Sequence, residues 1–464
     1  MQPNSDLVAP LTACGYTPVA RLRPRTAHEI TGSPWSIGCE TLDRDYADFT
    51  HIGPHLGELG AKHVRLQAGW AKCEPVPGAP FHWDWLDVIV NGCVAQGVKP
   101  WLETSYGNPA YPGGGGIGLA EGIPVSEEAL AGWDRWVAAL VARYGDRVDT
   151  WEIWNEPDNH DAVAPEAYAA FFIRTARLLR AAQAGARIVG LALAWHDERD
   201  YAGRFVAALA AAGETRLLDE VCFHFYTYNP DETFDMVDDL FRRCSRLAPH
   251  VTLRQGETGA PSACQRFMAM GGADWSERKQ AAWNLRRLLA HHARGIPMSL
   301  FQLSDMYYEK KNGALFAGWN PKGLLCVRPD KTVAYRKPSY FAAQHVFSLF
   351  DDSFPLRALE RLPGRFPFYA SAYAWKRHGE TRASIIGWWR ADATPSLHTP
   401  ARLDIVGLDP APLGDPVLVD FMGGIVFTPP ASMVAGDASA WAALPCAETP
   451  LALAERSVLP LREL

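Results

Sequence analysis

Residues 149–159 read DTWEIWNEPDN, and this stretch decides the fold that we expect. Positions 151–154 form a short, mainly apolar run typical of a buried strand, and Asn-Glu-Pro at 155–157 ends it abruptly. In parallel α/β barrels the carboxyl ends of the strands carry the chemistry, so an acid placed there by a rigid strand is a candidate functional group. Glu156 is that acid. The plainer interpretation is a strand-end glutamate that merely accepts a hydrogen bond.

The quartet Trp154-Asn155-Glu156-Pro157 resembles the acid/base signature of a clan of retaining glycoside hydrolases that includes cellulases, β-xylosidases and β-glucosidases. The resemblance implies an α/β fold, a (β/α)8 TIM barrel, with a second glutamate, the nucleophile, at the end of the seventh strand. Residues 251–257, VTLRQGE, read as a strand that ends in Glu257. The separation of about a hundred residues leaves room for the two intervening βα units.

Further short apolar runs supply the other strands of such a barrel, and amphipathic helices separate them. We expect Ser126 and Ser276 to cap two of these helices and Pro165 to begin another. The expected strands are residues 35–40, 63–67, 99–103, 187–194, 220–226 and 297–303.

The length of 464 residues suits a barrel of about 250 to 350 residues with a smaller partner domain. We expect the barrel at residues 30–350. Residues 351–464 carry short β-rich runs separated by Pro, Gly and Asp, which predict an accessory β-sandwich. Residues 1–29 are interpreted as an arm that packs on this accessory domain. The two-part layout resembles glycoside hydrolase family 39 and neighbouring families.

Several side chains are expected to support the two glutamates. The resemblance implies that Arg65, on the second strand, lies beneath the nucleophile, and that Asn155 binds a sugar 2-hydroxyl. Strand alternation puts His224 and Tyr226 on one face, toward the barrel mouth. In the clan a tyrosine at this position donates a hydrogen bond to the nucleophile. Glu40 ends the first strand and is a candidate substrate-binding acid.

Two loop residues are also candidates for contact with a sugar. Asn108 lies in an aromatic loop after the third strand, and the four glycines 113–116 follow it. Those glycines do not form a phosphate-binding loop, because no Lys-Ser or Lys-Thr follows them. The clan often has a tryptophan at the end of strand eight; none stands there, so Trp319 in the following loop is the candidate stacking platform.

Composition limits the classes of partner. A net charge of −7 gives no basic surplus for nucleic acid, and no membrane-length apolar segment or leader stands in the sequence, so we expect a cytoplasmic protein unless a leader was removed. The nine cysteines form no CxxC pair and the histidines are scattered, so we expect no disulfide framework, metal or cofactor. The sequence leaves a homo-oligomer open.

The expected reaction is retaining hydrolysis of a β-glycoside by double displacement, with Glu156 as general acid/base and Glu257 as nucleophile. Three alternatives remain at this stage. A transglycosylase shares the covalent intermediate but uses a sugar acceptor. A non-catalytic barrel would bind carbohydrate without turnover, and a metal-dependent barrel hydrolase would need clustered ligands at the strand ends.

Overall fold

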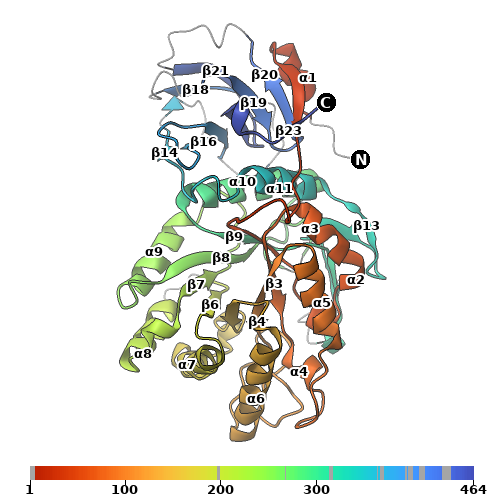
Figure 1. Cartoon of the computed structure of the whole chain (residues 1–464), viewed down its shortest axis with the longest axis vertical. Helices are drawn as coiled ribbons and strands as arrows, with labels where there is room; N and C mark the ends of the chain where they lie inside the picture. The colour runs from red at the N-terminus through yellow and green to blue at the C-terminus, as the bar shows by residue number, and fades with distance from the viewer. Residues whose placement is uncertain are drawn as a thin grey trace.

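The computed structural model forms a closed barrel that carries a β-rich domain on one side (Figure 1). Neighbouring barrel strands pair in parallel, and β9 pairs with β2 to close the ring. The structure describes residues 6–195, 199–266, 268–312, 317–362, 364–365, 370–391, 394–395, 401–406, 413–430 and 440–464.

The eight barrel strands lie at the positions that the sequence predicts, which confirms the (β/α)8 fold. Four strands are shorter than expected. Strand β2 ends two residues early and β6 one residue early, and β9 covers only residues 298–300. Strand β7 ends at Phe223, shortly before Phe225, whose φ is 26°. The strands are β2 (Trp35–Gly38), β3 (His63–Gln67), β4 (Lys99–Thr104), β5 (Thr150–Ile153), β6 (Arg187–Leu193), β7 (Glu220–Phe223), β8 (Thr252–Thr258) and β9 (Met298–Leu300).

Helices surround the barrel and begin where the local sequence predicts. The hydroxyl of Ser126 accepts a hydrogen bond from the Ala129 amide and that of Ser276 from the Lys279 amide, so both act as N-caps. The long helices are α5 (Asp84–Ala95), α6 (Glu127–Tyr144), α7 (Pro165–Ala182), α8 (Tyr201–Ala211), α9 (Phe234–Ser245), α10 (Glu277–Arg294) and α11 (Pro338–Leu349). The short helices are α1 (Val8–Ala13), α2 (Phe49–Ile52), α3 (Leu56–Leu59) and α4 (Trp70–Cys73).

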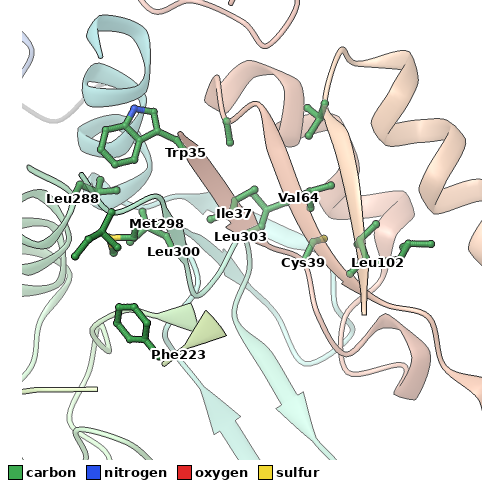
Figure 2. Packing of buried hydrophobic residues seen from close by; sticks show 14 of the residues in the cluster. Trp35, Ile37, Cys39, Val64, Leu102, Phe223, Leu288, Met298, Leu300 and Leu303 are labelled. Atoms are coloured by element: carbon green, nitrogen blue, oxygen red, sulfur yellow. The ribbon is translucent and has the colours of Figure 1, made fainter. Parts of the chain in front are cut away.

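The main hydrophobic core lies between the strands and these helices. Figure 2 shows Trp35 and Ile37 of β2 near Met298 and Leu300 of β9, with Leu288 of α10 beside them. Alternate residues of the same strands point into the barrel and are often polar. The barrel interior can therefore hold charged side chains while the outer layer supplies apolar burial.

The second domain contains two antiparallel sheets, as expected for a β-sandwich. The larger sheet has the order β14 (Glu360–Arg361), β16 (Ala370–Trp375), β17 (Ile385–Arg390), β22 (Leu451–Glu455), β19 (Pro416–Asp420), β20 (Ile425–Thr428), β1 (Thr17–Leu22) and β23 (Leu461–Arg462). The smaller has the order β15 (Gly364–Arg365), β18 (Ala401–Val406) and β21 (Ala440–Cys446).

The predicted N-terminal arm contributes β1, which pairs with both β20 and β23. Helices α10 and α11 lie between barrel and sandwich (Figure 1). Arg294 of α10 donates to the Tyr373 hydroxyl at 2.8 Å, and His345 of α11 donates to the Phe421 carbonyl at 2.8 Å. The domain boundaries themselves stay a prediction.

Two hairpins follow β9 and form part of the rim of the barrel. They are β10 (Met306–Tyr308) with β11 (Gly318–Asn320), and β12 (Leu325–Val327) with β13 (Val333–Arg336). Across the described ranges, none of the helices has both the length and the apolar character needed to span a bilayer.

Candidate active site

Glu156 stands at the mouth of the barrel on an unusual piece of backbone. Directly after β5, Trp154 and Glu156 have φ values of 68° and 46°, a left-handed conformation that non-glycine residues seldom adopt. The Glu156 amide donates to the Ala192 carbonyl at 3.1 Å, and the Trp154 ring packs against Phe171. The strained segment is thus held by neighbouring structure, a feature that clusters at functional sites.

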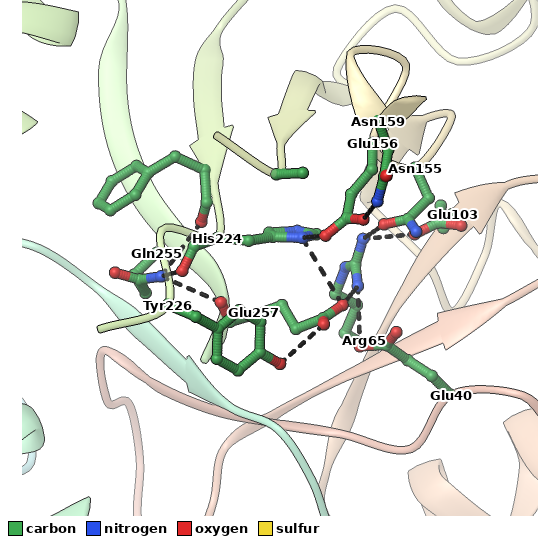
Figure 3. A network of polar contacts seen from close by, with 12 residues as sticks. Glu40, Arg65, Glu103, Asn155, Glu156, Asn159, His224, Tyr226, Gln255 and Glu257 are labelled. Carbon is green, nitrogen blue, oxygen red and sulfur yellow. Dashed lines mark hydrogen bonds and ion pairs between the residues drawn. The ribbon is translucent and has the colours of Figure 1, made fainter. Parts of the chain in front are cut away.

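The Glu156 carboxyl group is buried but fully hydrogen-bonded (Figure 3). One oxygen lies 2.7 Å from Nδ1 of His224, and the other accepts from the Asn159 amide nitrogen at 2.6 Å. With the residue only 7% exposed, burial raises the pKa of Glu156 to about 7, although the Asn159 hydrogen bond and the Arg65 charge lower it. At neutral pH this group is therefore a mixture of acid and carboxylate.

Glu257, on β8, has a different environment. One oxygen accepts from the Tyr226 hydroxyl at 2.8 Å and the other from the Arg65 guanidinium at 3.3 Å. Nδ1 of His224 is 3.7 Å from the second oxygen. A fixed positive charge and a fixed hydroxyl donor both stabilise negative charge on Glu257.

The two carboxyl groups face each other across a short gap. One oxygen of Glu156, one oxygen of Glu257 and a ring nitrogen of His224 all lie within 4.8 Å of one another. Figure 3 shows both carboxylates converging beside the His224 ring. Retaining glycosidases have carboxyl groups about 5 Å apart and inverting ones about 6.5 to 9.5 Å apart, so this spacing matches the retaining arrangement.

Arg65 is completely buried at the centre of a carboxylate cluster. It contacts Glu152 at 2.7 Å, Glu40 at 2.7 Å and Glu103, in addition to Glu257. Burial alone would lower the pKa of Arg65, but these carboxylates raise it well above its ordinary value. Burial raises the pKa of Glu103 to about 8 and that of Glu40 well above its usual range. Arg65 therefore stays charged and fixed in place.

Asn155 links this cluster to the loop after β4. Its amide oxygen accepts from Arg65 at 2.9 Å, and its amide nitrogen donates to the Tyr106 hydroxyl at 2.7 Å. Tyr106 also lines a cavity of about 210 Å³ whose other walls include Arg44 and Trp70. Asn155 is thus held in a fixed orientation, and its partner Tyr106 lines the neighbouring cavity.

Two predicted site residues lie apart from the carboxylate cluster. Asn108 is buried in its own loop, where it donates to the Glu74 carbonyl at 2.7 Å and accepts from the Ala110 amide at 3.0 Å. Its side chain thus stabilises the loop through these two hydrogen bonds. Its contact with a sugar stays a prediction. Trp319, on β11, is 36% exposed, and its role as a stacking platform also stays a prediction.

Glu40 was expected to bind substrate, and in the structure its carboxyl group forms an ion pair with Arg65, which also contacts Glu257. A contact of Glu40 with a sugar stays a prediction. Glu103 was not singled out from the sequence, although it lies near the carboxyl end of β4 and also contacts Arg65.

Lys322 is a further residue that sequence reasoning missed. Its side chain is buried, the residue being 2% exposed, and Nζ lies 5.3 Å from the centre of the Tyr226 ring. Burial lowers the pKa of Lys322 to about 8, while the charge of Glu257 raises it. The ammonium group therefore lies between the Tyr226 ring and the charge of Glu257, close to the two carboxyl groups. The irregular loop that carries it gives no sequence signal.

Two groups of described side chains bring three potential metal ligands within 4.8 Å of one another. One consists of Glu156, His224 and Glu257, and the other of Glu152, Cys222 and His224. From the sequence we expected no cluster of metal ligands, because the histidines are scattered. The fold nevertheless brings these side chains together. In the first group, other side chains already hydrogen-bond the carboxylates.

Comparison with known proteins identifies the fold. A family 39 glycoside hydrolase from the gut symbiont Bacteroides cellulosilyticus WH2 superimposes with a TM-score of 0.65, at 17% identity over 91% of this chain and 81% of that one. The chain has the fold of family 39 glycoside hydrolases. A family 39 β-xylosidase from Caulobacter crescentus superimposes with a TM-score of 0.56, at 19% identity over 94% of this chain and 98% of that one.

Sequence comparison gives a more distant match. A curated β-glucosidase from Agrobacterium sp. (strain ATCC 21400) is 27% identical over 124 residues, which is 26% of this chain. The matched region spans only a quarter of that relative's length. No protein-family model matches the chain. The resemblance expected from the sequence is therefore confirmed at the level of the fold.

Proposed function

We propose that this protein is a retaining β-glycosidase that acts through a covalent glycosyl-enzyme intermediate. The observation that supports this most strongly is the pair of strand-end glutamates, whose oxygens approach within 4.8 Å in contrasting surroundings. Glu156 is buried with its pKa raised to about 7, whereas Glu257 is bound by a cation and a hydroxyl donor. Two carboxyl groups in different environments are what an acid and a nucleophile require.

In the first step Glu156 gives its proton to the leaving-group oxygen while Glu257 attacks the anomeric carbon. In the second step the Glu156 carboxylate removes a proton from water, and the attacking water releases the sugar with net retention. His224 and Asn159 hold the two Glu156 oxygens, so that the proton transfers occur at a fixed position. Because the first step needs protonated Glu156, activity should fall as the pH rises through about 7.

The surrounding residues position the nucleophile and the sugar. Tyr226 and Arg65 orient the Glu257 carboxylate. Asn155, itself fixed by Arg65 and Tyr106, has a second amide hydrogen that can reach a 2-hydroxyl. Lys322 supplies a buried donor beside Tyr226 for another substrate oxygen.

β-Xylosides and β-glucosides are the first substrates to test, because a β-xylosidase and a β-glucosidase are among the similar proteins. A carbohydrate substrate is the partner that we propose. A cytoplasmic location and the state of assembly stay predictions.

The experiment is a panel of aryl β-glycosides, followed by chromophore release and by proton NMR of the first-formed product. We expect release from at least one pentoside or hexoside and a β-anomeric product that later mutarotates. An initial α-anomer would contradict the retaining mechanism. Binding without turnover across the panel would favour a carbohydrate-binding barrel, and glycoside products formed with added sugar would identify a transglycosylase.

A further inference from the structure

Beneath the catalytic carboxylates, three side chains from the barrel interior converge on one point. Glu152 lies on β5, Cys222 on β7, and His224 directly after β7. All three are fully buried. Glu152 is flanked by Trp151 and Ile153, which belong to the outer hydrophobic core, so Glu152 points inward. Cys222 and His224 are two residues apart and share the inward face for the same reason.

This cluster contains two buried polar atoms that lack a hydrogen-bond partner. They are Oε1 of Glu152 and Nε2 of His224. The opposite atom of each group is occupied, since Oε2 of Glu152 accepts from Arg65 at 2.7 Å and Nδ1 of His224 lies 2.7 Å from Glu156. The Cys222 thiol has a single hydrogen, which interacts with the Glu152 carboxylate, so Nε2 of His224 stays without a partner. Buried polar atoms without partners are rare in proteins and require an explanation.

The geometry of the cluster suits a small ion. One oxygen of Glu152, Sγ of Cys222 and a ring nitrogen of His224 lie within 4.8 Å of one another. Gly256 borders them: a Cβ there would stand 2.1 Å from Sγ of Cys222 and 3.7 Å from Nε2 of His224. Glycine at this position therefore lets the thiol lie against the backbone beside the His224 ring.

We propose that Glu152, Cys222 and His224 form a binding site for a borderline-soft divalent cation of the zinc class. A thiolate, an imidazole nitrogen and a carboxylate oxygen are the ligands that Zn2+ prefers, whereas Mg2+ and Ca2+ prefer oxygen alone. The ion would bind the unpartnered Nε2 of His224 and replace the thiol hydrogen as the partner of Glu152. Binding replaces the thiol proton of Cys222, which leaves to solvent.

The neighbouring groups fit this assignment. Nδ1 of His224 faces the Glu156 carboxylate, and a metal-bound histidine usually donates its other ring N–H to such a group. Arg65 is the centre of four carboxyl contacts, so the interior holds more acidic than basic groups and accommodates added positive charge. The upper trio of Glu156, His224 and Glu257 is the poorer site, because Asn159, Tyr226 and Arg65 already bind its carboxylates.

The test uses Co2+ as a spectroscopic probe on the full chain, after treatment with a chelator. The exposed Cys14 and Cys264 and the partly exposed Cys326 are first replaced by serine, so that an accessible thiol cannot give the signal. We expect one Co2+ per chain, with thiolate-to-cobalt charge-transfer absorption that Zn2+ abolishes by competition. Cys222→Ala should remove this absorption and weaken binding at least tenfold. The matched control is Cys244→Ala, a fully buried cysteine on α9, which should bind as the parent does.

Three results would overturn the site. They are no binding by the parent protein, binding without thiolate absorption, and an unchanged spectrum in Cys222→Ala. If Cys222→Ala fails to fold, anomalous scattering at the zinc edge from parent crystals soaked in Zn2+ decides the question. A peak between Glu152, Cys222 and His224 supports the proposal, and no peak there contradicts it. None of these readouts depends on the glycosidase reaction.

Discussion

Asn159 is expected to set the upper end of the pH range in which the protein is active. Its amide nitrogen donates to Glu156 at 2.6 Å, and this hydrogen bond lowers the pKa that burial raises to about 7. A hydrogen bond to a charged group contributes roughly 1.5 kcal/mol, and one pKa unit corresponds to about 1.4 kcal/mol. Asn159→Ala removes a donor that favours the ionised form. The pKa of Glu156 should therefore rise by about one unit, to roughly 8.

The assay is kcat/KM against pH for an aryl glycoside with a poor leaving group, because the basic limb then reports the acid of the free enzyme. We expect that limb near pH 7 in the parent protein and about one unit higher in Asn159→Ala. Asn91→Ala is the matched control, since Asn91 is an exposed asparagine that accepts from Arg147 far from the site. A basic limb that stays in place, or moves to lower pH, would refute the role given to Asn159 and the identity of the acid.

Three further predictions concern the same reaction. Tyr226→Phe removes the hydroxyl donor 2.8 Å from Glu257 and should lower kcat by about 10- to 1,000-fold with an unchanged melting temperature; unchanged kinetics would remove Tyr226 from the site. Glycosidase activity should persist after exhaustive chelation, because two carboxyl groups suffice for the chemistry; a complete loss that one divalent ion restores would count against the mechanism. Glu156→Ala should slow substrates with poor leaving groups far more than activated ones, and added azide should give a β-glycosyl azide from a β-glycoside; an equal loss on every leaving group would contradict its role as the acid.

The barrel was predictable because its signals are local. The strands are short runs with regular apolar positions, and Glu156 and Glu257 lie at or just beyond the carboxyl ends of two of them. The resemblance of Trp154-Asn155-Glu156-Pro157 to the clan signature implied the pairing with Glu257, and order and spacing were consistent with it. The spacing of His224 and Tyr226 likewise implied that both point the same way. His224 contacts the carboxyl group of Glu156, and Tyr226 donates to that of Glu257.

Other features depend on contacts between distant parts of the chain. Strand β1 pairs with segments about 400 residues away, which no local pattern encodes. The sequence also gave no sign that Glu40 forms an ion pair with Arg65, because the two residues lie on different strands. Lys322 lies in an irregular loop, and its burial beside Tyr226 appears only in three dimensions. From the sequence, Cys222 looks like any small core residue. Only the three-dimensional structure shows that Glu152 lies beside it.

In the proposed mechanism Glu257 forms a covalent bond to the sugar. The most direct measurement is mass spectrometry after incubation with an activated 2-deoxy-2-fluoro-β-glycoside of a sugar that the protein hydrolyses, since the fluorine slows breakdown of the intermediate. We expect one added sugar per chain, located by peptide mapping on Glu257, and turnover that recovers as the label is released. A label on another carboxylate, or no label on a protein that inverts its substrate, would contradict the account.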